Sequence, residues 1–259
     1  ANIRYLEKDG FAPLEITGGS LKSTQRQIDV SNVASSQFIS ALLMISPLIK
    51  GDFEFRLNPK MNSFTYLLLT ISAMRRLGFS IYINGSVIKV DKHRKFNGEF
   101  FKVEPDWSSF YYWYAMAQIA DKVDLAFEGL KQGNMQKDRR LLFTFGNPAL
   151  LFSELPEGLL LVKEKVNRFE FPQKINLSQF PDLAPTFVIL AAIAKKQMVF
   201  KGLESLPVKE SDRIKAMQEQ LALLNCTFKE QDNGWLLNAT DFRLEKNTCF
   251  PTFKDHRMA

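Results

Sequence analysis

Residues 182–206 read DLAPTFVILAAIAKKQMVFKGLESL, and this stretch of sequence decides the fold. It opens with small and polar residues, continues as a long apolar run, and ends in a short segment rich in strand formers. A helix that is apolar nearly all round is typical of a buried helix, because a surface helix keeps one polar face. The stretch therefore predicts a buried helix, a tight turn and a strand.

The same pattern occurs twice upstream, so the chain contains an internal repeat. Residues 35–57 read SSQFISALLMISPLIKGDFEFRL, and residues 108–130 read SSFYYWYAMAQIADKVDLAFEGL. The three helices begin near Ser36, Ser109 and Ala184, at a spacing of about 75 residues that indicates repeated structural units. Strand candidates precede the helices, and they begin at Arg26, Glu99 and Lys174.

Two of the three copies continue clearly with a second helix and a hairpin. These continuations are residues 65–90 and residues 210–239. Each contains an Asn-Gly pair, at residues 84–85 and 233–234, and such pairs favour hairpins because both residues tolerate positive φ. In the middle copy, two prolines interrupt the helical pattern after Met135, so the assignment of a second helix there stays open.

The repeated unit is thus βαβαββ, which indicates an α/β fold. The natural architecture for helices that are apolar on all sides is to enclose them with sheet. On this interpretation the apolar residues of the first helices form the core and do not form a cofactor site. The residues assigned to the core are Ile39, Leu42, Leu43, Ile45, Tyr114, Met116, Ile119, Val188, Ile189 and Ile193.

The bulk composition is that of an ordinary globular protein. Hydrophobic residues make up 46% and charged residues 24% of the 259 residues, which argues against a largely disordered chain. The only cysteines, Cys226 and Cys249, have no CxxC spacing, so neither a disulfide scaffold nor a zinc knuckle is expected. The sequence has no uninterrupted apolar run of the roughly 18 residues that a membrane span needs, and its start does not resemble a signal peptide. A cytoplasmic location and no membrane association are therefore predicted.

The net charge of +6 suits small anions better than nucleic acid. The basic clusters at residues 92–95 and 137–140 are not interleaved with aromatic residues as in nucleic-acid-binding modules. They are read as a solvated basic surface, and no nucleic-acid partner is predicted. The two histidines, His93 and His256, belong to no cluster with metal-ligand spacing, so no metal or other cofactor is expected.

Polar residues at helix starts are the candidate site residues. Buried helices that point the same way bring their N-termini together, where free N–H groups and helix dipoles attract anions. Serine and aspartate are also the preferred N-caps, so capping alone explains any one of these groups. The groups are residues 35–37, 106–109, 181–182 and 209–213.

The segment VKESDRIKAM at residues 208–217 carries an unusual density of charge. Lys209, Glu210 and Arg213 place two cations and a carboxylate within one helical turn. The alternative is a simple surface pair of Glu210 with Arg213, which contributes only ~0.2 to 0.5 kcal/mol to helix stability. The closing segment KDHRMA is similarly polar and has no apolar pattern to explain it.

Three of these segments resemble signatures of the 5-enolpyruvylshikimate-3-phosphate synthase family. They are SSQF at residues 35–38, VKESDR at 208–213 and DHRMA at 255–259, in the same order and spacing. The similarity continues through residues 18–44 and through the segments SFTY, VEPDWSS, NMQKD and FPDLAPT. It implies two domains of βαβαββ units, with residues 1–102 in the domain on the shikimate 3-phosphate side and 103–259 in the second domain. Both domains are expected to be partial, because the family's N-terminal segment and C-terminal tail are not found.

The resemblance implies a reaction and its participants. Family members transfer the enolpyruvyl group of phosphoenolpyruvate to the 5-hydroxyl of shikimate 3-phosphate and release phosphate, in the pathway to chorismate and the aromatic amino acids. No cofactor or metal is implied. The expected partners are these two small substrates, and the expected state is a monomer.

The resemblance also implies roles for individual residues. Asp182 would take the proton of the 5-hydroxyl, and Glu210 would deliver a proton to the methylene carbon of phosphoenolpyruvate. Tyr66 would line the shikimate side, where packing explains an aromatic residue almost equally well. Shikimate 3-phosphate would be bound by Ser35, Ser36, Gln37, Ser63, Asp182 and Lys209, and phosphoenolpyruvate by Gln37, Arg213 and Arg257.

Some positions depart from the family pattern. Ser205 and Pro207 replace polar residues of many members, and the bulky context of Ser108 and Ser109 favours a capping role for both. Three alternatives remain. A sister transferase that acts on a UDP-sugar needs a cysteine-bearing loop, and neither Cys226 nor Cys249 has that context. An RNA-end-processing protein has no supporting motif. The third alternative is an inactive fragment that at most binds shikimate 3-phosphate.

Overall fold

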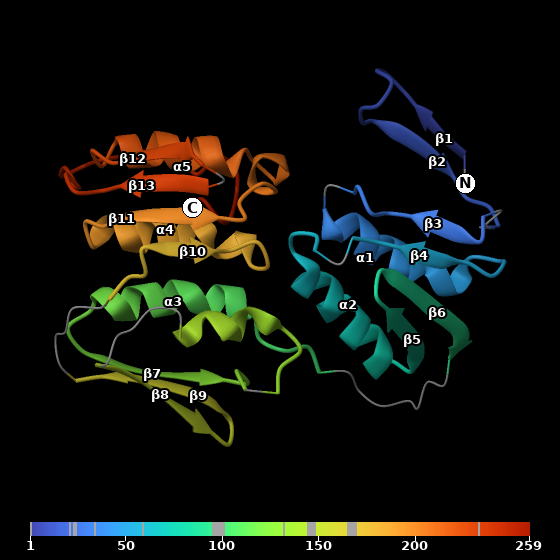
Figure 1. Cartoon of the computed structure of the whole chain (residues 1–259), viewed down its shortest axis with the longest axis horizontal. Coiled ribbons are helices and arrows are strands. Elements are labelled where there is room, and N and C mark those ends of the chain that lie inside the picture. The colour runs from blue at the N-terminus through green and yellow to red at the C-terminus, as the bar shows by residue number, and fades with distance from the viewer. Residues whose placement is uncertain are drawn as a thin grey trace. The chain divides into compact units, whose positions relative to one another are not determined.

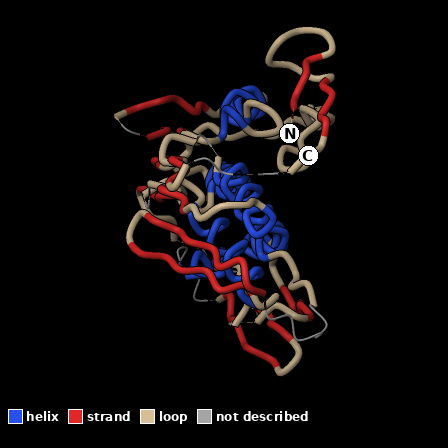
Figure 2. Tube along the Cα trace, turned by 90° about the vertical axis from the view of Figure 1, so that its right-hand side faces the viewer, coloured by secondary structure: helices blue, strands red, loops and turns tan. Residues whose placement is uncertain are grey.

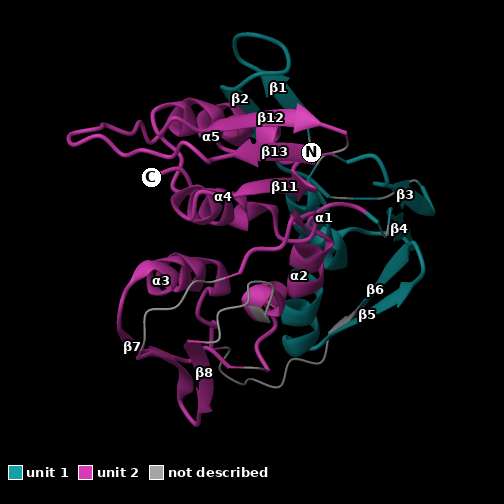
Figure 3. Ribbon diagram, turned by 60° about the vertical axis from the view of Figure 1, so that its left-hand side comes forward, with its two compact units in different colours: residues 1–60, 70–100 teal, residues 61–69, 101–259 magenta. Residues whose placement is uncertain are grey.

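The computed structural model describes residues 2–20, 22, 25–33, 35–58, 60–94, 102–131, 133–143, 149–164, 170–232 and 234–259. The chain forms two compact units, shown in different colours in Figure 3. Unit 1 contains Ala1–Lys60 and Thr70–Phe100, and unit 2 contains Met61–Leu69 and Phe101–Ala259.

Most of the first βαβαββ unit lies in unit 1, and its last two strands form a hairpin. Its four-stranded sheet has the order β3-β4-β6-β5, with β3 parallel to β4 and the other neighbours antiparallel. A separate hairpin of β1 and β2 has only exposed residues, and it is drawn with its loop in Figure 2. The elements are β1 (Asn2–Tyr5), β2 (Leu14–Thr17), β3 (Gln27–Asp29), α1 (Ser36–Ile45), η1 (Ser46–Leu48), β4 (Glu54–Arg56), α2 (Phe64–Arg76), β5 (Phe79–Asn84) and β6 (Val87–Arg94), of which α2 begins in unit 2.

The last part of unit 2 repeats this topology strand for strand. Its sheet order is β10-β11-β13-β12, with β10 parallel to β11 and the other neighbours antiparallel. Helix α4 contacts β11 and β13, and α5 contacts β12 (Figure 1). The elements are β10 (Lys174–Asn176), η3 (Pro181–Leu183), α4 (Ala184–Ile193), β11 (Gln197–Lys201), η4 (Leu206–Val208), α5 (Arg213–Ala222), β12 (Thr227–Gln231) and β13 (Gly234–Asn238). The predicted βαβαββ unit is thereby confirmed in two copies.

The middle copy, in the first part of unit 2, is a reduced version of the unit. It forms a three-stranded antiparallel sheet with the order β7-β9-β8, which matches the last three strands of the other sheets. A 3₁₀ helix stands where the other copies have a second α-helix, at the one position where the sequence left a second helix open. The strand candidate from Glu99 falls partly outside the described residues, and residues 102–104 form no strand. The elements are α3 (Trp107–Ile119), β7 (Val123–Glu128), η2 (Lys137–Phe143), β8 (Leu150–Leu155) and β9 (Gly158–Lys163).

A buried cation fixes the C-terminal end of α3 to the adjacent sheet. Lys163, the last residue of β9, is buried, and its Nζ donates to the carbonyls of Gln118 at 2.8 Å and Ala120 at 2.7 Å. The last carbonyls of a helix have no partner within the helix and carry partial negative charge. Burial lowers the pKa of Lys163, and the charge of Asp121 partly offsets this effect. Lys163 therefore stabilises the helix end by satisfying its free acceptors.

The core of unit 2 is aromatic where α3 meets α4. Trp107, Tyr111, Tyr114 and Phe187 are fully buried, and the rings of Tyr111 and Phe187 are 5.4 Å apart. Aromatic pairs in edge-to-face geometry at such distances contribute beyond their buried area. This contact joins the first helices of two successive repeat units into one core.

The predicted enclosure of these helices by sheet is only partly correct. Ile39, Leu43, Tyr114 and Val188 are buried as predicted, and Leu42 is half-buried. The core assignment is wrong for five residues whose side chains are exposed, namely Ile45, Met116, Ile119, Ile189 and Ile193. In unit 2, the sheets and neighbouring helices cover only part of the circumference of α3 and α4. The remaining apolar faces line a groove together with residues of α5 and the chain's last three residues. No helix among the described residues has the length and hydropathy to cross a membrane.

Candidate active site

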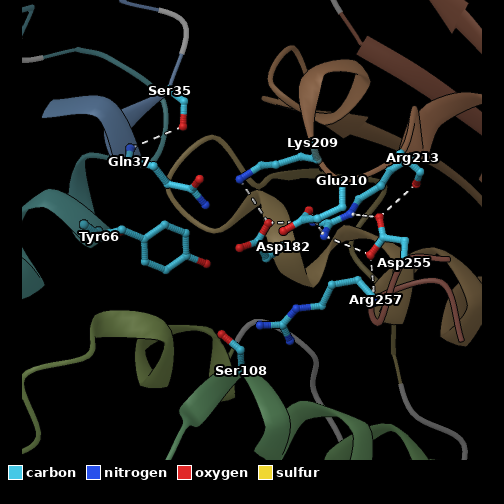
Figure 4. A network of polar contacts seen from close by, with 12 residues as sticks. Ser35, Gln37, Tyr66, Ser108, Asp182, Lys209, Glu210, Arg213, Asp255 and Arg257 are labelled. Atoms are coloured by element: carbon cyan, nitrogen blue, oxygen red, sulfur yellow. Dashed lines mark hydrogen bonds and ion pairs between the residues drawn. The ribbon is translucent and has the colours of Figure 1, made fainter. Parts of the chain in front are cut away.

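In unit 1, the predicted site residues occupy the start of α1. Ser35 is the N-cap, and its Oγ accepts a hydrogen bond from the backbone N–H of Gln37 at 3.3 Å (Figure 4). Ser36 is buried and Gln37 is exposed. The first N–H groups of α1 form the positive end of the helix dipole, which attracts anions. The capping role is thus confirmed for Ser35, and its substrate role stays a prediction.

In unit 2, Ser63 and Tyr66 belong to the segment that packs against the turn after β10. Ser63 has a φ of 63°, which is uncommon for a residue with a side chain, and its N–H donates to the carbonyl of Ser178 at 2.8 Å. The Tyr66 hydroxyl lies 3.5 Å from Asp138 Oδ1. Burial raises the pKa of Tyr66 well above its ordinary value, and the negative charges of Asp138 and Asp182 add to this effect.

At the start of α3, neither of the two serines that the sequence suggested as caps is the N-cap, and their hydroxyls have different partners. Asp106 is the N-cap and accepts hydrogen bonds from the N–H groups of Ser108 at 2.9 Å and Ser109 at 3.1 Å. The Ser109 hydroxyl also donates to Asp106, whereas the buried Ser108 hydroxyl donates to Asp138 Oδ1 at 2.9 Å. The capping side chain is therefore Asp106, and Ser108 contacts a buried carboxylate instead.

Asp138 was not predicted as a site residue, although it lies in the NMQKD segment. Its side chain is fully buried, and its Oδ2 has no hydrogen-bond partner among the described residues. Burial raises the pKa of Asp138 to about 6, although the hydrogen bond from Ser108 opposes this rise. The sequence signal was ambiguous, because the neighbouring Lys137, Arg139 and Arg140 made the segment resemble a basic surface cluster.

Arg213, the first residue of α5, is the centre of a network of ion pairs with three carboxylates. Its side chain is only 1% exposed. Its Nη1 donates to Asp182 Oδ1 at 2.8 Å, its Nη2 to Glu210 Oε2 at 2.6 Å, and its Nε to Asp255 Oδ2 at 2.8 Å (Figure 4). The alternative of a surface pair on a helix is therefore wrong, because Glu210 precedes α5 and Arg213 is buried.

Asp255 is the second residue that the sequence analysis missed. Its buried carboxylate accepts hydrogen bonds from Arg213 Nε, from Ser211 Oγ at 2.8 Å and from the N–H of Arg257 at 2.9 Å. Burial raises the pKa of Asp255, but these hydrogen bonds and the charge of Arg213 outweigh it and hold the pKa well below its usual range. Burial similarly lowers the pKa of Arg213, but Asp255, Asp182 and Glu210 together raise it above its ordinary value.

Two further cations complete the group. Lys209 Nζ lies 3.3 Å from Asp182 Oδ1, so Asp182 is shared between two cations. Arg257 is partly buried and forms no ion pair within the described residues. Burial lowers the pKa of Arg257, whereas its hydrogen bond with Tyr112 and the charges of Asp182 and Asp106 raise it more strongly.

The structure thus brings together most of the site residues predicted in unit 2. Asp182, Lys209, Glu210 and Arg213 are in direct contact, and the backbone of Arg257 is hydrogen-bonded to the same network. Guanidinium and ammonium groups bind carboxylates and phosphates, and a partly exposed carboxylate can transfer protons. The residue types of the group are therefore suited to anion binding and to acid–base chemistry. Ser205 is buried outside this network, and its Oγ has no hydrogen-bond partner among the described residues.

Comparisons with known proteins identify relatives over the whole chain. The 3-phosphoshikimate 1-carboxyvinyltransferase of Bacteroides fragilis is 34% identical over 100% of this chain and 62% of its own length. The enzyme of the same name from Haemophilus ducreyi is 31% identical, over 100% of this chain and 58% of its own length. The chain therefore spans about three fifths of the length of these curated relatives.

Solved structures give the same result for the fold. An EPSP synthase from Acinetobacter baumannii matches with a TM-score of 0.65 and 24% identity, over 92% of this chain and 53% of that one. The enolpyruvyl transferase NikO from Streptomyces tendae matches with a TM-score of 0.55 and 14% identity, over 88% of this chain and 53% of that one. The model of the family described as EPSP synthase (3-phosphoshikimate 1-carboxyvinyltransferase) matches residues 1–259. The chain therefore belongs to the EPSP synthase family.

Proposed function

We propose that this chain carries part of the machinery that transfers the enolpyruvyl group of phosphoenolpyruvate to the 5-hydroxyl of shikimate 3-phosphate. The reaction releases inorganic phosphate and serves the synthesis of chorismate and the aromatic amino acids. The observation that carries the proposal is the contact network of Asp182, Lys209, Glu210 and Arg213, which lies on the family's motifs. It offers both the cations for two anionic substrates and the carboxylates for two proton transfers.

The proton transfers are assigned to the two partly exposed carboxylates. Asp182, which is 19% exposed and lies beside Lys209, accepts the proton of the 5-hydroxyl group. At the same time the oxygen of this hydroxyl group bonds to the central carbon of phosphoenolpyruvate. Glu210, 46% exposed, gives a proton to the methylene carbon, which becomes a methyl group in the tetrahedral adduct. Loss of a methyl proton and of phosphate from the adduct then restores the double bond. Lys209 orients the substrate hydroxyls.

Substrate binding is assigned to the remaining residues. In unit 1 the proposal assigns Ser35, Ser36 and Gln37 to shikimate 3-phosphate, because the start of α1 offers neutral donors to a dianion. In unit 2 it assigns Ser63, Asp182 and Lys209 to the same substrate, with Tyr66 as a lining residue. Phosphoenolpyruvate is assigned to Arg213, Arg257 and Gln37, because the guanidinium fork can donate two parallel hydrogen bonds to a carboxylate or phosphate.

The functional domains follow from the same assignment. Residues 1–102 form part of the domain on the shikimate 3-phosphate side, and residues 103–259 form part of the domain with the acid, the base and the phosphoenolpyruvate-binding residues. The monomeric state, the cytoplasmic location and the independence from cofactors and nucleic acid stay predictions.

A second candidate function is binding without turnover. It is favoured by the length of the chain, which spans 62% of its Bacteroides fragilis relative, because groups that bind the same anions act as one preorganised unit. A polypeptide with only part of such a unit can retain affinity for shikimate 3-phosphate and lose turnover.

Two measurements on the chain decide between these functions. The transferase function is supported if the chain releases phosphate when it is mixed with both substrates and the Asp182→Asn variant does not. Calorimetric binding of shikimate 3-phosphate without phosphate release supports the binding fragment. An absence of both would contradict any direct role of this chain in the reaction.

A further inference from the structure

The guanidinium of Arg213 is nearly saturated with acceptors from its own chain. In addition to the bonds already described, its Nη2 donates to Asp255 Oδ1 at 3.1 Å. Four of its five N–H groups therefore have an acceptor, and only one on Nη1 has none among the described residues. An incoming carboxylate that needs two parallel bonds finds only one free donor. Bidentate binding of an anion at this arginine consequently requires that a protein carboxylate leaves.

The three carboxylates on Arg213 are not equally free to leave. Asp255 is 0% exposed, holds Arg213 through both its oxygens and is fixed by two further donors. Glu210 contacts Arg213 through one oxygen only, and its side chain is 46% exposed. Asp182 is intermediate, being 19% exposed and shared with Lys209. An exposed ion pair made through one oxygen is weak, so Glu210 is the partner that a competing anion displaces most easily.

The charges of the network also favour an exchange over a simple addition. Lys209, Arg213 and Arg257 balance the carboxylates of Asp182, Glu210 and Asp255, so the cluster has no net positive charge for an anion. A released Glu210 carboxylate next to a bound anion experiences repulsion, which favours its protonated form. Glu210 is paired with Arg213 on α5, which also contacts Asp182 on η3 and Asp255 in the C-terminal segment. Lys209 adjoins Glu210 in the chain and contacts Asp182, while His256 and the backbone of Arg257 contact Asp255.

We propose that the Nη1–Nη2 edge of Arg213 is an exchange site, at which an incoming carboxylate or phosphate oxyanion displaces Glu210 and the released Glu210 takes up a proton from solvent. Asp255 is the positioning residue that holds Arg213 in place during the exchange. The inference deepens the proposed function, because the displacing anion there is phosphoenolpyruvate. Binding of this donor then produces the protonated carboxyl group that its methylene carbon needs, so the acid is formed only when the substrate is present.

Affinity for an anion tests the exchange without any turnover. We titrate the chain with phosphoenolpyruvate by calorimetry, and we compare it with Glu210→Gln. If Glu210 competes with the anion, removal of its charge tightens binding, by up to about five-fold for a weak ion pair. A residue that only supports substrate binding gives the opposite sign. Glu230→Gln is the matched control, because Glu230 is an exposed glutamate on β12 and its substitution removes the same charge.

The outcomes of this titration are decisive in each direction. Tighter binding by Glu210→Gln, with unchanged binding by Glu230→Gln, supports the exchange. Equal or weaker binding by Glu210→Gln overturns it. An absence of binding to both proteins at roughly 20 mM phosphoenolpyruvate, which would still detect millimolar affinity, overturns it too. Asp255→Asn is expected to weaken binding, and its melting temperature shows whether it still folds.

Proton uptake tests the second half of the proposal. Binding enthalpies are measured at pH 6.5 in two buffers that differ in ionisation enthalpy, which reports the protons taken up with the anion. The chain is expected to take up a fraction of a proton, and Glu210→Gln close to none. Equal uptake by both proteins overturns the protonation of Glu210. If phosphoenolpyruvate binds with these signatures but no phosphate is released with both substrates, the exchange stands and the transferase function of this chain fails.

Discussion

Asp138 and Asp255 are both fully buried carboxylates in unit 2, and their pKa values are shifted in opposite directions. Asp138 accepts from neutral donors, has one oxygen without a hydrogen-bond partner among the described residues, and has a pKa raised to about 6 by burial. Asp255 has a guanidinium, a hydroxyl and a backbone N–H as donors, and its pKa lies well below the usual range. Both side chains are almost inaccessible to solvent, but Asp138 is surrounded more deeply by protein, so the depth of burial and the donors both contribute to the difference.

The comparison teaches which carboxylate the fold stabilises in its charged form. A buried charge costs free energy unless a partner and hydrogen bonds compensate for it. Asp255 has this compensation from a charged partner and positions Arg213, whereas the donors found for Asp138 are neutral and its pKa is raised to about 6. Four changes test the contrast, from the largest expected effect to the smallest.

Asp255→Asn should break the compensated site and lower the free energy of unfolding by about 3 kcal/mol, because Arg213 stays buried without its main partner. The measurement is urea denaturation at pH 7.5. Since the pKa of Asp255 is lowered in the folded chain, its stabilisation is present above the pKa of the unfolded state and is lost as the pH falls through the folded value. The stability of the two proteins should converge only in strong acid, and equal stability at pH 7.5 would contradict the assignment.

Asp138→Asn should have the opposite sign and raise the free energy of unfolding at pH 7.5, by about 2 kcal/mol. The pKa of Asp138 is raised to about 6 in the folded chain, so its cost is absent below the unfolded pKa and grows as the pH rises through 6. Urea denaturation at several pH values between 4 and 8 should show this loss of stability in the parent chain and a flatter profile in the variant. A destabilised Asp138→Asn at pH 7.5 would show that the charge is compensated after all.

Arg213→Lys tests whether substrate binding needs the guanidinium group or only its positive charge. A lysine retains the charge but has three donors, so it cannot replace the two parallel bonds to Asp255 and also both bonds to Asp182 and Glu210. We expect the KM for phosphoenolpyruvate to rise about tenfold in a full-length form of the enzyme, which corresponds to about 1.4 kcal/mol. Unchanged kinetics would falsify the assignment of Arg213 to this substrate.

Ser108→Ala should have the smallest effect, a loss of about 1 kcal/mol, because it removes the hydrogen bond of a hydroxyl to a buried carboxylate and the acceptor of a longer bond from Gln136. It should also move the pKa of Asp138 further above its usual range, which carboxyl NMR can follow. Ser109→Ala is the matched control on the same helix start, because the exposed Ser109 contacts Asp106 and not Asp138. Equal effects of the two substitutions on the pKa of Asp138 would refute the specific role of Ser108.

The repeat shows how far local pattern predicts the fold. The βαβαββ unit was predicted from helix periodicity, Asn-Gly hairpin pairs and a spacing of about 75 residues, and two sheets with the same strand order confirm it. Helix periodicity and hairpin pairs are local signals, because each depends on neighbours within one element or turn, and the repeat spacing compares such local patterns along the chain. The core assignment was less successful. Ile189 and Ile193 have the same apolar character as buried Val188, and only the packing of other elements distinguishes them.

The candidate site shows the same limit. Asp182, Lys209, Glu210, Arg213 and Arg257 were proposed from motifs, but no spacing in the sequence predicted that three carboxylates share one guanidinium. Asp255 lies 42 positions from Arg213 in the sequence. Asp138 lies 30 positions from Ser108, whose hydroxyl donates a hydrogen bond to its carboxylate. The identity of the side chains was visible, and their partners were not.

The sequence by itself determined the α/β class, the repeated unit, the family and the residue types that can bind anions and transfer protons. These follow from periodicity, turn chemistry and contiguous motifs, which are properties of neighbouring residues, and from the recurrence of the same local pattern along the chain. Only the tertiary structure decided that Asp255 is a compensated partner of Arg213, that Asp138 is a buried and incompletely satisfied acid, and that Glu210 is the exposed partner of the network. Burial and hydrogen-bond geometry set the energy of a charge, and both depend on segments that are far apart in the chain.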